Sequence, residues 1–294
     1  MILEAWQSLL SALQKEKSMM GIGTVGIVLA VHSCAGFLLE GIWYTSEVQW
    51  LQPLQFNLAM GIYSFTTAVF LTLTAWNSMT LRLFRFFYIL SLLYLYIHEN
   101  LLTLLGRNSP FSSGPFLTSE LTNIPLYAAV AILTALCVLL AVRFFSRPSV
   151  HAQSYPTILG IRYGLLSTAL GAVAVFIMSL FQNSGDSVGG VLFIHLFGFH
   201  GIHAVSFIGW AMARTPLPEE QKLAYVHTAG LAWFSGTVAV TVPSLQSLPF
   251  VFPTKWTWLS IAAILVWFTV FIRCLTHIRN AERSKAALPK SFSS

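Results

Sequence analysis

The feature that most constrains this chain is the recurrence of apolar stretches about as long as a membrane is thick. A helix that crosses about 30 Å of hydrocarbon needs about 20 mostly apolar residues. Inside lipid, a helix satisfies its own backbone hydrogen bonds, so each stretch is predicted to be helical. Eight spans can be drawn, roughly at residues 20–44, 56–76, 85–106, 124–145, 160–182, 189–213, 223–242 and 257–276. The expected fold is therefore all-α, a polytopic integral membrane helix bundle.

The composition agrees with this class. Hydrophobic residues make up 56% of the 294 residues and charged residues only 9%, whereas a soluble domain has about 25% charged residues. The net charge of +6 does not indicate a nucleic-acid partner, because Lys and Arg form no basic face. The expected partner is the lipid bilayer, and association with other membrane subunits is left open.

The positions of Lys and Arg predict the orientation of the spans. Basic residues near span ends are retained on the cytoplasmic side. With the N-terminus placed inside, eight spans put 14 of the 16 Lys and Arg residues in cytoplasmic segments and only Arg107 and Lys255 outside. We therefore expect about eight transmembrane helices in a plasma membrane, with both termini cytoplasmic.

The two ends of the chain differ from the bundle between them. Residues 1–18 place apolar side chains on one face, which predicts an amphipathic helix lying in the interface; the charge-first order of a signal peptide is absent. Residues 19–277 are expected to form a single transmembrane bundle domain. Residues 278–294 contain four basic side chains and are expected to be a basic cytoplasmic tail.

Turn and packing signals divide the bundle further. Dipeptides such as Gln52-Pro53 and the run Thr215–Pro218 indicate turns between spans. Small residues allow helices to approach closely in lipid. This role is expected for a set of glycines in the fifth, sixth and seventh spans: Gly160, Gly164, Gly171, Gly198, Gly201, Gly209, Gly230 and Gly236.

Ionisable side chains inside spans are costly and are functional candidates by default. The segment VLFIHLFGFHGIHAVSFIGW carries His195, His200 and His203. At 100° per residue the three imidazoles fit one wide face, and His200 and His203 are surface neighbours. Their arc and their spread over more than two turns predict one wall of a site, because three such rings are poorly placed to bind one ion alone.

The opposite wall is expected from two other spans. His32 is near the middle of the first span, and His98 and Glu99 are slightly outward of the middle of the third. Glu40 adds a carboxylate two turns from His32, toward the outside. Tyr94, one turn before His98, should share its face, whereas Glu99 points about 100° away. His227 is expected at the interface, and His277 is expected to be an ordinary solvated residue.

These residues favour a cofactor site. Imidazole is the commonest transition-metal ligand and also binds haem iron. The leading hypothesis is a haem- or metal-binding protein with a redox or metal-handling role. His32, His98, His200 and His203 would bind the cofactor, whereas a metal ion would use His195, His200, His203, His98, Glu99 and Glu40. The spacing does not match the H-E-x-x-H helix of zinc proteases.

Two other functions are compatible with the same residues. Chains of His and Glu inside spans can relay protons, as in a proton-coupled transporter or channel. Alternatively, the histidines could be neutral and hydrogen-bonded, and hold the helices of a scaffold or assembly protein together. No residue pattern identifies a substrate, so enzymatic activity, as a membrane oxidoreductase, stays open.

Overall fold

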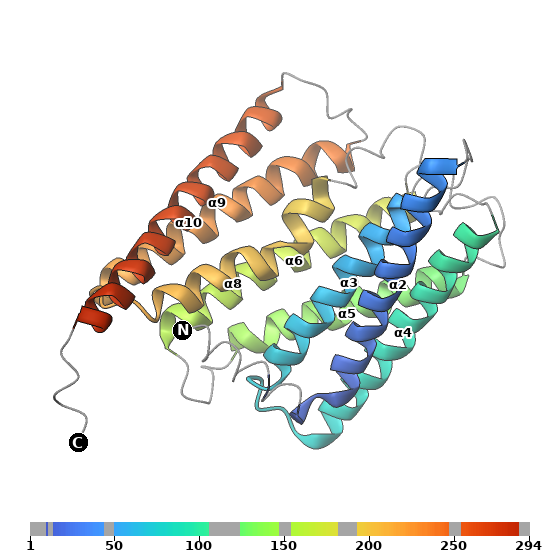
Figure 1. Ribbon diagram of the computed structural model, residues 1–294, viewed down its shortest axis with the longest axis horizontal. Coiled ribbons are helices and arrows are strands. Elements are labelled where there is room, and N and C mark those ends of the chain that lie inside the picture. The colour runs from blue at the N-terminus through green and yellow to red at the C-terminus, as the bar shows by residue number, and fades with distance from the viewer. Residues whose placement is uncertain are drawn as a thin grey trace. The chain divides into compact units, whose positions relative to one another are not determined.

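The computed structural model describes residues 10, 14–43, 50–105, 124–146, 154–181, 193–246 and 254–287. Within these ranges every regular element is a helix (Figure 1). The helices are α2 (Lys17–Trp43), α3 (Leu51–Leu71), α4 (Ser78–Leu104), α5 (Ile124–Ser146), α6 (Tyr155–Phe181), the π-helix η1 (His195–Phe199), α8 (Gly201–Met212), α9 (Glu219–Leu245) and α10 (Lys255–Ala287). The all-α expectation is confirmed for the described part of the chain.

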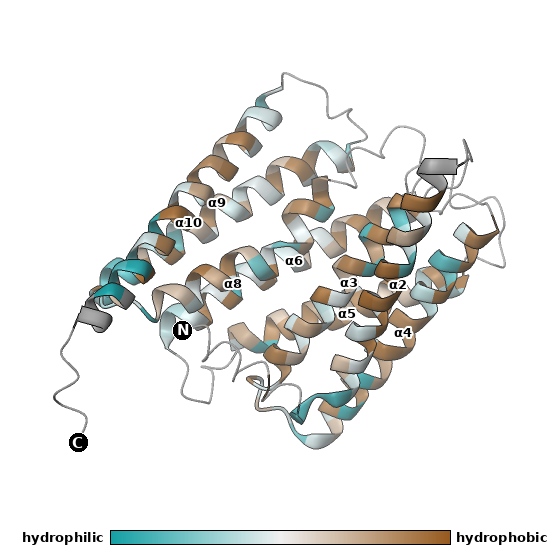
Figure 2. Ribbon diagram, in the orientation of Figure 1, coloured by the Kyte–Doolittle hydropathy of each residue, from teal (hydrophilic) through white to brown (hydrophobic). Residues whose placement is uncertain are grey.

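Seven of these helices are long and apolar enough to cross a membrane: α2, α3, α4, α5, α6, α9 and α10. The buried share of the most apolar window of each helix runs from 22% in α10 to 50% in α6, so at least half of each window is not buried inside the protein. Figure 2 shows that hydrophobic residues dominate these helices and that hydrophilic residues gather toward the C-terminal end of α10. The chain is a multi-pass membrane protein.

The sixth predicted span differs from the other seven. Residues 193–212 are helical, but the α-helix gives way to η1 at His195–Phe199 and resumes as α8 at Gly201. A π-helical turn inside an α-helix is rare and occurs frequently at functional sites. The segment that carries three histidines is therefore the one with irregular helical geometry.

Several predicted boundaries were wrong by a turn or more. The third span begins at Ser78 because Asn77 caps it, accepting a hydrogen bond on Oδ1 from the Thr80 amide at 2.8 Å. Pro53 does not mark a turn, because proline is tolerated in the first turn of a helix and α3 begins at Leu51. The last helix continues to Ala287, so the predicted tail begins as helix.

Other terminal predictions lie mostly outside the described residues. The amphipathic helix expected at residues 1–18 falls there, apart from a few positions, and α2 already begins at Lys17. The loop expected at Thr215–Pro218 is confirmed, since no helix covers it. The chain divides into two compact units, Met1–Leu139 with Phe176–Val188 and Leu140–Val175 with Gly189–Ser294. The single-domain boundaries stay a prediction.

The first unit contains α2, α3, α4 and most of α5. Its core includes a cluster around Leu95 of α4 and Leu126 of α5. An ion pair joins the start of α2 to α4: Arg85 donates to both carboxylate oxygens of Glu16, at 2.7 and 2.6 Å. α2 and α4 therefore begin at the same end of this unit, as their predicted parallel direction requires.

A buried amide pair also ties this unit together. Asn57 of α3 and Asn100 of α4 donate to one another's side-chain oxygens at 3.0 and 3.1 Å. Asn57 is fully buried and also lies within 3.4 Å of the Ser33 hydroxyl on α2. Because unpaired amides are costly away from water, these bonds fix three helices in one register.

The second unit contains most of α6, then η1, α8, α9 and α10. Glycines allow α6 to lie directly against the segment η1–α8. A Cβ built on Gly160 would lie 2.9 Å from Cα of Gly209, and one built on Gly171 would lie 2.7 Å from Cα of Gly198. Gly164 faces the Gly201 carbonyl in the same way. The predicted packing role of these glycines is confirmed.

Candidate functional site

The backbone of η1 is held by side chains of two neighbouring helices. In a π-helical turn the usual hydrogen-bond pattern is interrupted, so carbonyl groups become available to other donors. The Phe197 carbonyl accepts from the indole N–H of Trp233 at 2.6 Å and from Thr237 at 3.2 Å, both on α9. The Gly198 carbonyl accepts from Thr168 of α6 at 3.1 Å. Tertiary contacts therefore fix the backbone geometry of the segment that carries the histidines.

The packing of the same segment is equally specific. The Phe197 ring lies where a side chain on Gly236 of α9 would be, because a Cβ there would approach the ring to 2.3 Å. Phe197 also contacts the Trp233 ring at a centroid distance of 5.6 Å. Phe197 and Gly198 are buried, whereas the three histidines are half-buried. The backbone of η1 is therefore enclosed by its neighbours, and both ring nitrogens of the half-buried His203 are buried as well.

The three imidazoles form a continuous file along η1 and α8. The ring centroids of His195 and His200 are 5.4 Å apart with planes at 82°. Those of His200 and His203 are 5.7 Å apart with planes at 48°. His200 is therefore the central ring and the one that contacts both others. We call these three residues the histidine ladder.

The histidines predicted for the opposite wall belong to the first unit. His32 of α2 is exposed, and its ring meets Trp50 edge-on at a centroid distance of 5.7 Å. His98 of α4 is half-buried and lies against Tyr94 at 5.8 Å, as their spacing of one turn predicted. The Nδ1 atom of His98 is buried and has no hydrogen-bond partner among the described residues.

The structure describes the side chain of only one of the two predicted carboxylates. Glu99 is buried, with 1% of the residue exposed, and its carbonyl accepts a hydrogen bond from Thr103. Glu40 belongs to α2, but its side chain lies outside the described part of the chain. Among the described residues, no group of three or more His, Cys, Asp or Glu side chains is arranged to hold a metal ion. The expected cofactor-binding and metal-binding sets stay predictions.

Two histidines outside the ladder have structural partners. His227 of α9 is exposed, and its Nδ1 atom lies 2.9 Å from the Tyr163 hydroxyl of α6. The prediction that His277 is an ordinary solvated residue was wrong. It lies within α10 because that helix extends past the predicted span, and its Nε2 atom is 3.3 Å from the Tyr225 hydroxyl.

The pattern of ionisable side chains did not predict the buried amides of Asn57 and Asn100, because an amide carries no charge. A single Asn in an otherwise apolar span was the available signal, since its amide has to find partners within the bundle. The two amides satisfy one another, which makes them a structural element.

Comparison with known proteins assigns no function to the site. No family model, curated protein or solved structure matches this chain.

Proposed function

We propose that this membrane protein binds a transition-metal ion through His200 and a neighbouring imidazole of the histidine ladder. The observation that carries the proposal is the spacing of the rings. Imidazole nitrogen binds zinc-like ions at about 2.1 Å, so two imidazoles on a tetrahedral ion have their ring centres about 5 Å apart. The ladder has centroid separations of 5.4 and 5.7 Å. Small ring rotations would bring either pair onto one ion.

The rigidity of the segment supports the same proposal. Metal sites are more precise when the ligands stand on fixed elements. Trp233, Thr237 and Thr168 hold the backbone between His195 and His200 by hydrogen bonds from α9 and α6. These contacts keep the two ligands on one side of the helix without using either imidazole.

Two imidazoles do not complete a metal site, since zinc-type sites use three or four protein ligands or leave one position to water. The remaining positions on the ion would go to the third imidazole of the ladder or to water, and His98, Glu99, His32 and Glu40, which belong to the first unit, stay predictions from the sequence. A bound ion would supply redox chemistry or act as the transported or stored species, which is the redox or metal-handling role. We further place the protein in the plasma membrane, with both termini cytoplasmic.

Haem is the related alternative. Haem iron takes axial ligands on opposite faces of a flat ring, and two imidazoles adjacent on one helix cannot occupy opposite faces. One histidine of the ladder would then bind iron, and the second axial ligand would have to come from outside the ladder. The close spacing within the ladder therefore favours an ion over haem.

The proposal is tested on the full-length protein purified in detergent. Elemental analysis is expected to find a stoichiometric transition metal, and the absorption spectrum to lack a Soret band. The variant His200→Ala should lose at least most of this metal, because the central ring belongs to both possible pairs. His227→Ala is the matched control and should keep it. Equal metal content in all three proteins would contradict the proposal, and a Soret band lost in His200→Ala would replace the ion with haem.

A second candidate function follows from the continuity of the ladder. Neutral imidazole has one nitrogen that donates and one that accepts a proton, so three rings in contact could pass protons along the helix. Proton flux in proteoliposomes would measure this. Flux that persists after metal removal and is lost in His200→Ala would favour proton translocation over metal handling.

A further inference from the structure

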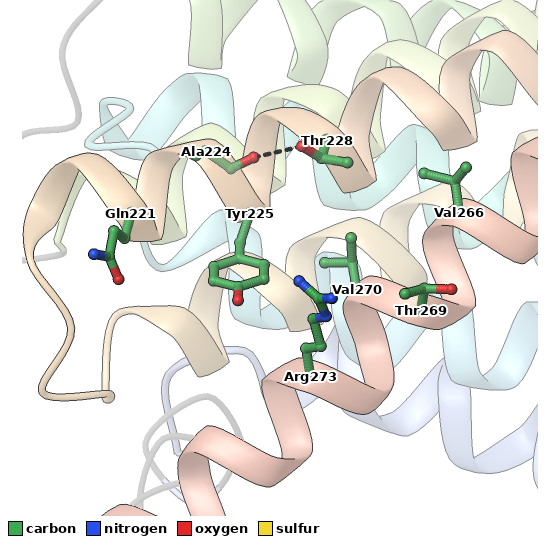
Figure 3. A pocket seen from close by; sticks show the side chains of 8 residues that line it. All are labelled: Gln221, Ala224, Tyr225, Thr228, Val266, Thr269, Val270 and Arg273. Carbon is green, nitrogen blue, oxygen red and sulfur yellow. Dashed lines mark hydrogen bonds between the residues drawn. The ribbon is translucent and has the colours of Figure 1, made fainter.

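A groove between α9 and α10 holds a combination of residues that the metal proposal does not use. Its volume is about 450 Å³. On the α9 side it is lined by Gln221, Ala224, Tyr225 and Thr228, and on the α10 side by Val266, Thr269, Val270 and Arg273. Figure 3 shows Tyr225 and Arg273 projecting into the space between the two helices.

The chemistry of the groove changes along the helix axes. Arg273 and Tyr225 are at its polar end, and Val266 is about 10 Å farther along α10, at 1.5 Å per residue. The two threonines farther from the polar end are exposed and already have hydrogen-bond partners: Thr228 donates to the Ala224 carbonyl and Thr269 to the Leu265 carbonyl, each at 2.8 Å. The groove is therefore charged at one end and apolar in character at the other.

Among the described residues, no acidic side chain neutralises the charge at the polar end. Arg273 is exposed, and no acidic side chain in the described ranges lies within ion-pair distance of it. Glu219, at the start of α9, forms its ion pair with Lys222 at 3.7 Å. Tyr225 is positioned beside Arg273 by His277, whose Nε2 atom is 3.3 Å from its hydroxyl.

The depth of Arg273 suits a membrane interface. It lies about 27 Å along α10 from Lys255, which is close to the thickness of the hydrocarbon layer. Arginine at this level can hold its guanidinium among headgroups while its stem stays in the apolar layer. The predicted orientation places this end in the cytoplasmic leaflet, where anionic lipids are enriched.

We propose that the groove between α9 and α10 binds one anionic phospholipid. The phosphate lies against the guanidinium of Arg273 and the hydroxyl of Tyr225, and an acyl chain follows Val270 and Val266 between the helices. Gln221 adds an amide at the headgroup end. Basic pockets between transmembrane helices recognise lipid headgroups by the same combination of charge and apolar wall.

The test measures lipid retained by the full chain in nanodiscs or after detergent extraction. Bilayers of phosphatidylcholine with added phosphatidylglycerol are compared with bilayers of phosphatidylcholine alone. Wild-type protein is expected to enrich phosphatidylglycerol, and Arg273→Gln to lower its retention about fivefold, since one basic residue near an anionic surface contributes ~1 kcal/mol. Arg279→Gln is the matched control, because this exposed arginine of α10 lies outside the groove.

A second variant separates binding from folding. Thr228→Phe fills the groove away from its charged end without changing any charge, and it should also lower phosphatidylglycerol retention while helical content stays that of the wild type. Equal retention of neutral and anionic lipid, or an equal loss in Arg273→Gln and Arg279→Gln, would overturn the proposal. So would displacement of the lipid by inorganic phosphate, which would identify a free anion as the ligand.

Discussion

At the scale of single residues, the ion pair between Glu16 and Arg85 shows how a charge is accommodated at the edge of an apolar bundle. Glu16 is only 3% exposed and Arg85 26%. Their contact is bidentate, which is the strong geometry for a guanidinium and a carboxylate. Removing one partner leaves the other charge largely buried, and that costs more than the net worth of the pair.

We therefore expect Arg85→Gln to lower the free energy of unfolding by about 1–3 kcal/mol. Thermal unfolding in detergent, followed by circular dichroism, measures this. Arg82→Gln changes an exposed arginine one turn earlier and should have little effect. The assigned role of the pair would be wrong if both variants unfolded at the same temperature.

Residue types predicted the site only in part. Histidines stand out in an apolar segment, and helical periodicity predicted that His200 and His203 are neighbours, as their centroid distance of 5.7 Å confirms. The partners of Asn57 could not be predicted, because the pairing with Asn100 depends on how α3 and α4 pack. The contact of His277 with Tyr225 was missed for the same reason.

At the scale of elements, the histidine ladder depends on how closely α6 approaches η1. The Cα atoms of Gly171 and Gly198 meet at this crossing, where a Cβ on Gly171 would be 2.7 Å from Cα of Gly198. Backbone at this distance cannot move aside as a flexible side chain can. Any side chain at position 171 must therefore push the helices apart.

Gly171→Ala is expected to destabilise the protein by about 1–3 kcal/mol, the usual cost of overpacking, and to reduce metal retention with it. Gly21→Ala is the matched control in α2, because a Cβ there meets nothing within 4 Å. That control should be neutral or slightly stabilising, since alanine favours helix over glycine. A stability of Gly171→Ala equal to that of the control would show that the crossing is not close.

The long helices could be predicted from the sequence, whereas the π-helical turn and several helix ends could not. Seven long helices followed from apolar length alone. The π-helical turn did not, because its stabilisation comes from Trp233 and Thr168 on other helices. Boundaries were wrong where a polar cap such as Asn77 or an N-terminal proline extended a helix beyond its apolar centre.

At the scale of the whole molecule, the distribution of Lys and Arg makes an orientation prediction. A fluorescent protein fused after Ser294 should fluoresce, and alkaline phosphatase at the same position should be inactive, because the C-terminus is predicted to be cytoplasmic. The same reporters joined after residue 107 should behave in the opposite way. The reverse pattern at both positions would contradict the predicted orientation.

The molecular scale is also where sequence was least informative about function. Periodicity places His200 and His203 on one helix face, but it does not say which span lies opposite. The ligands from His32, His98, Glu40 and Glu99 thus rest on depth estimates alone. The pair within the ladder rests on ring positions in one unit.

The most direct test of the metal proposal is electron paramagnetic resonance of the purified full chain loaded with one equivalent of Cu(II). We expect nitrogen superhyperfine splitting from at least two imidazoles in the wild type. The splitting should be reduced or absent in His200→Ala and unchanged in His227→Ala. A wild-type spectrum without imidazole nitrogens, or one that His200→Ala leaves unaltered, would contradict a metal site centred on the histidine ladder.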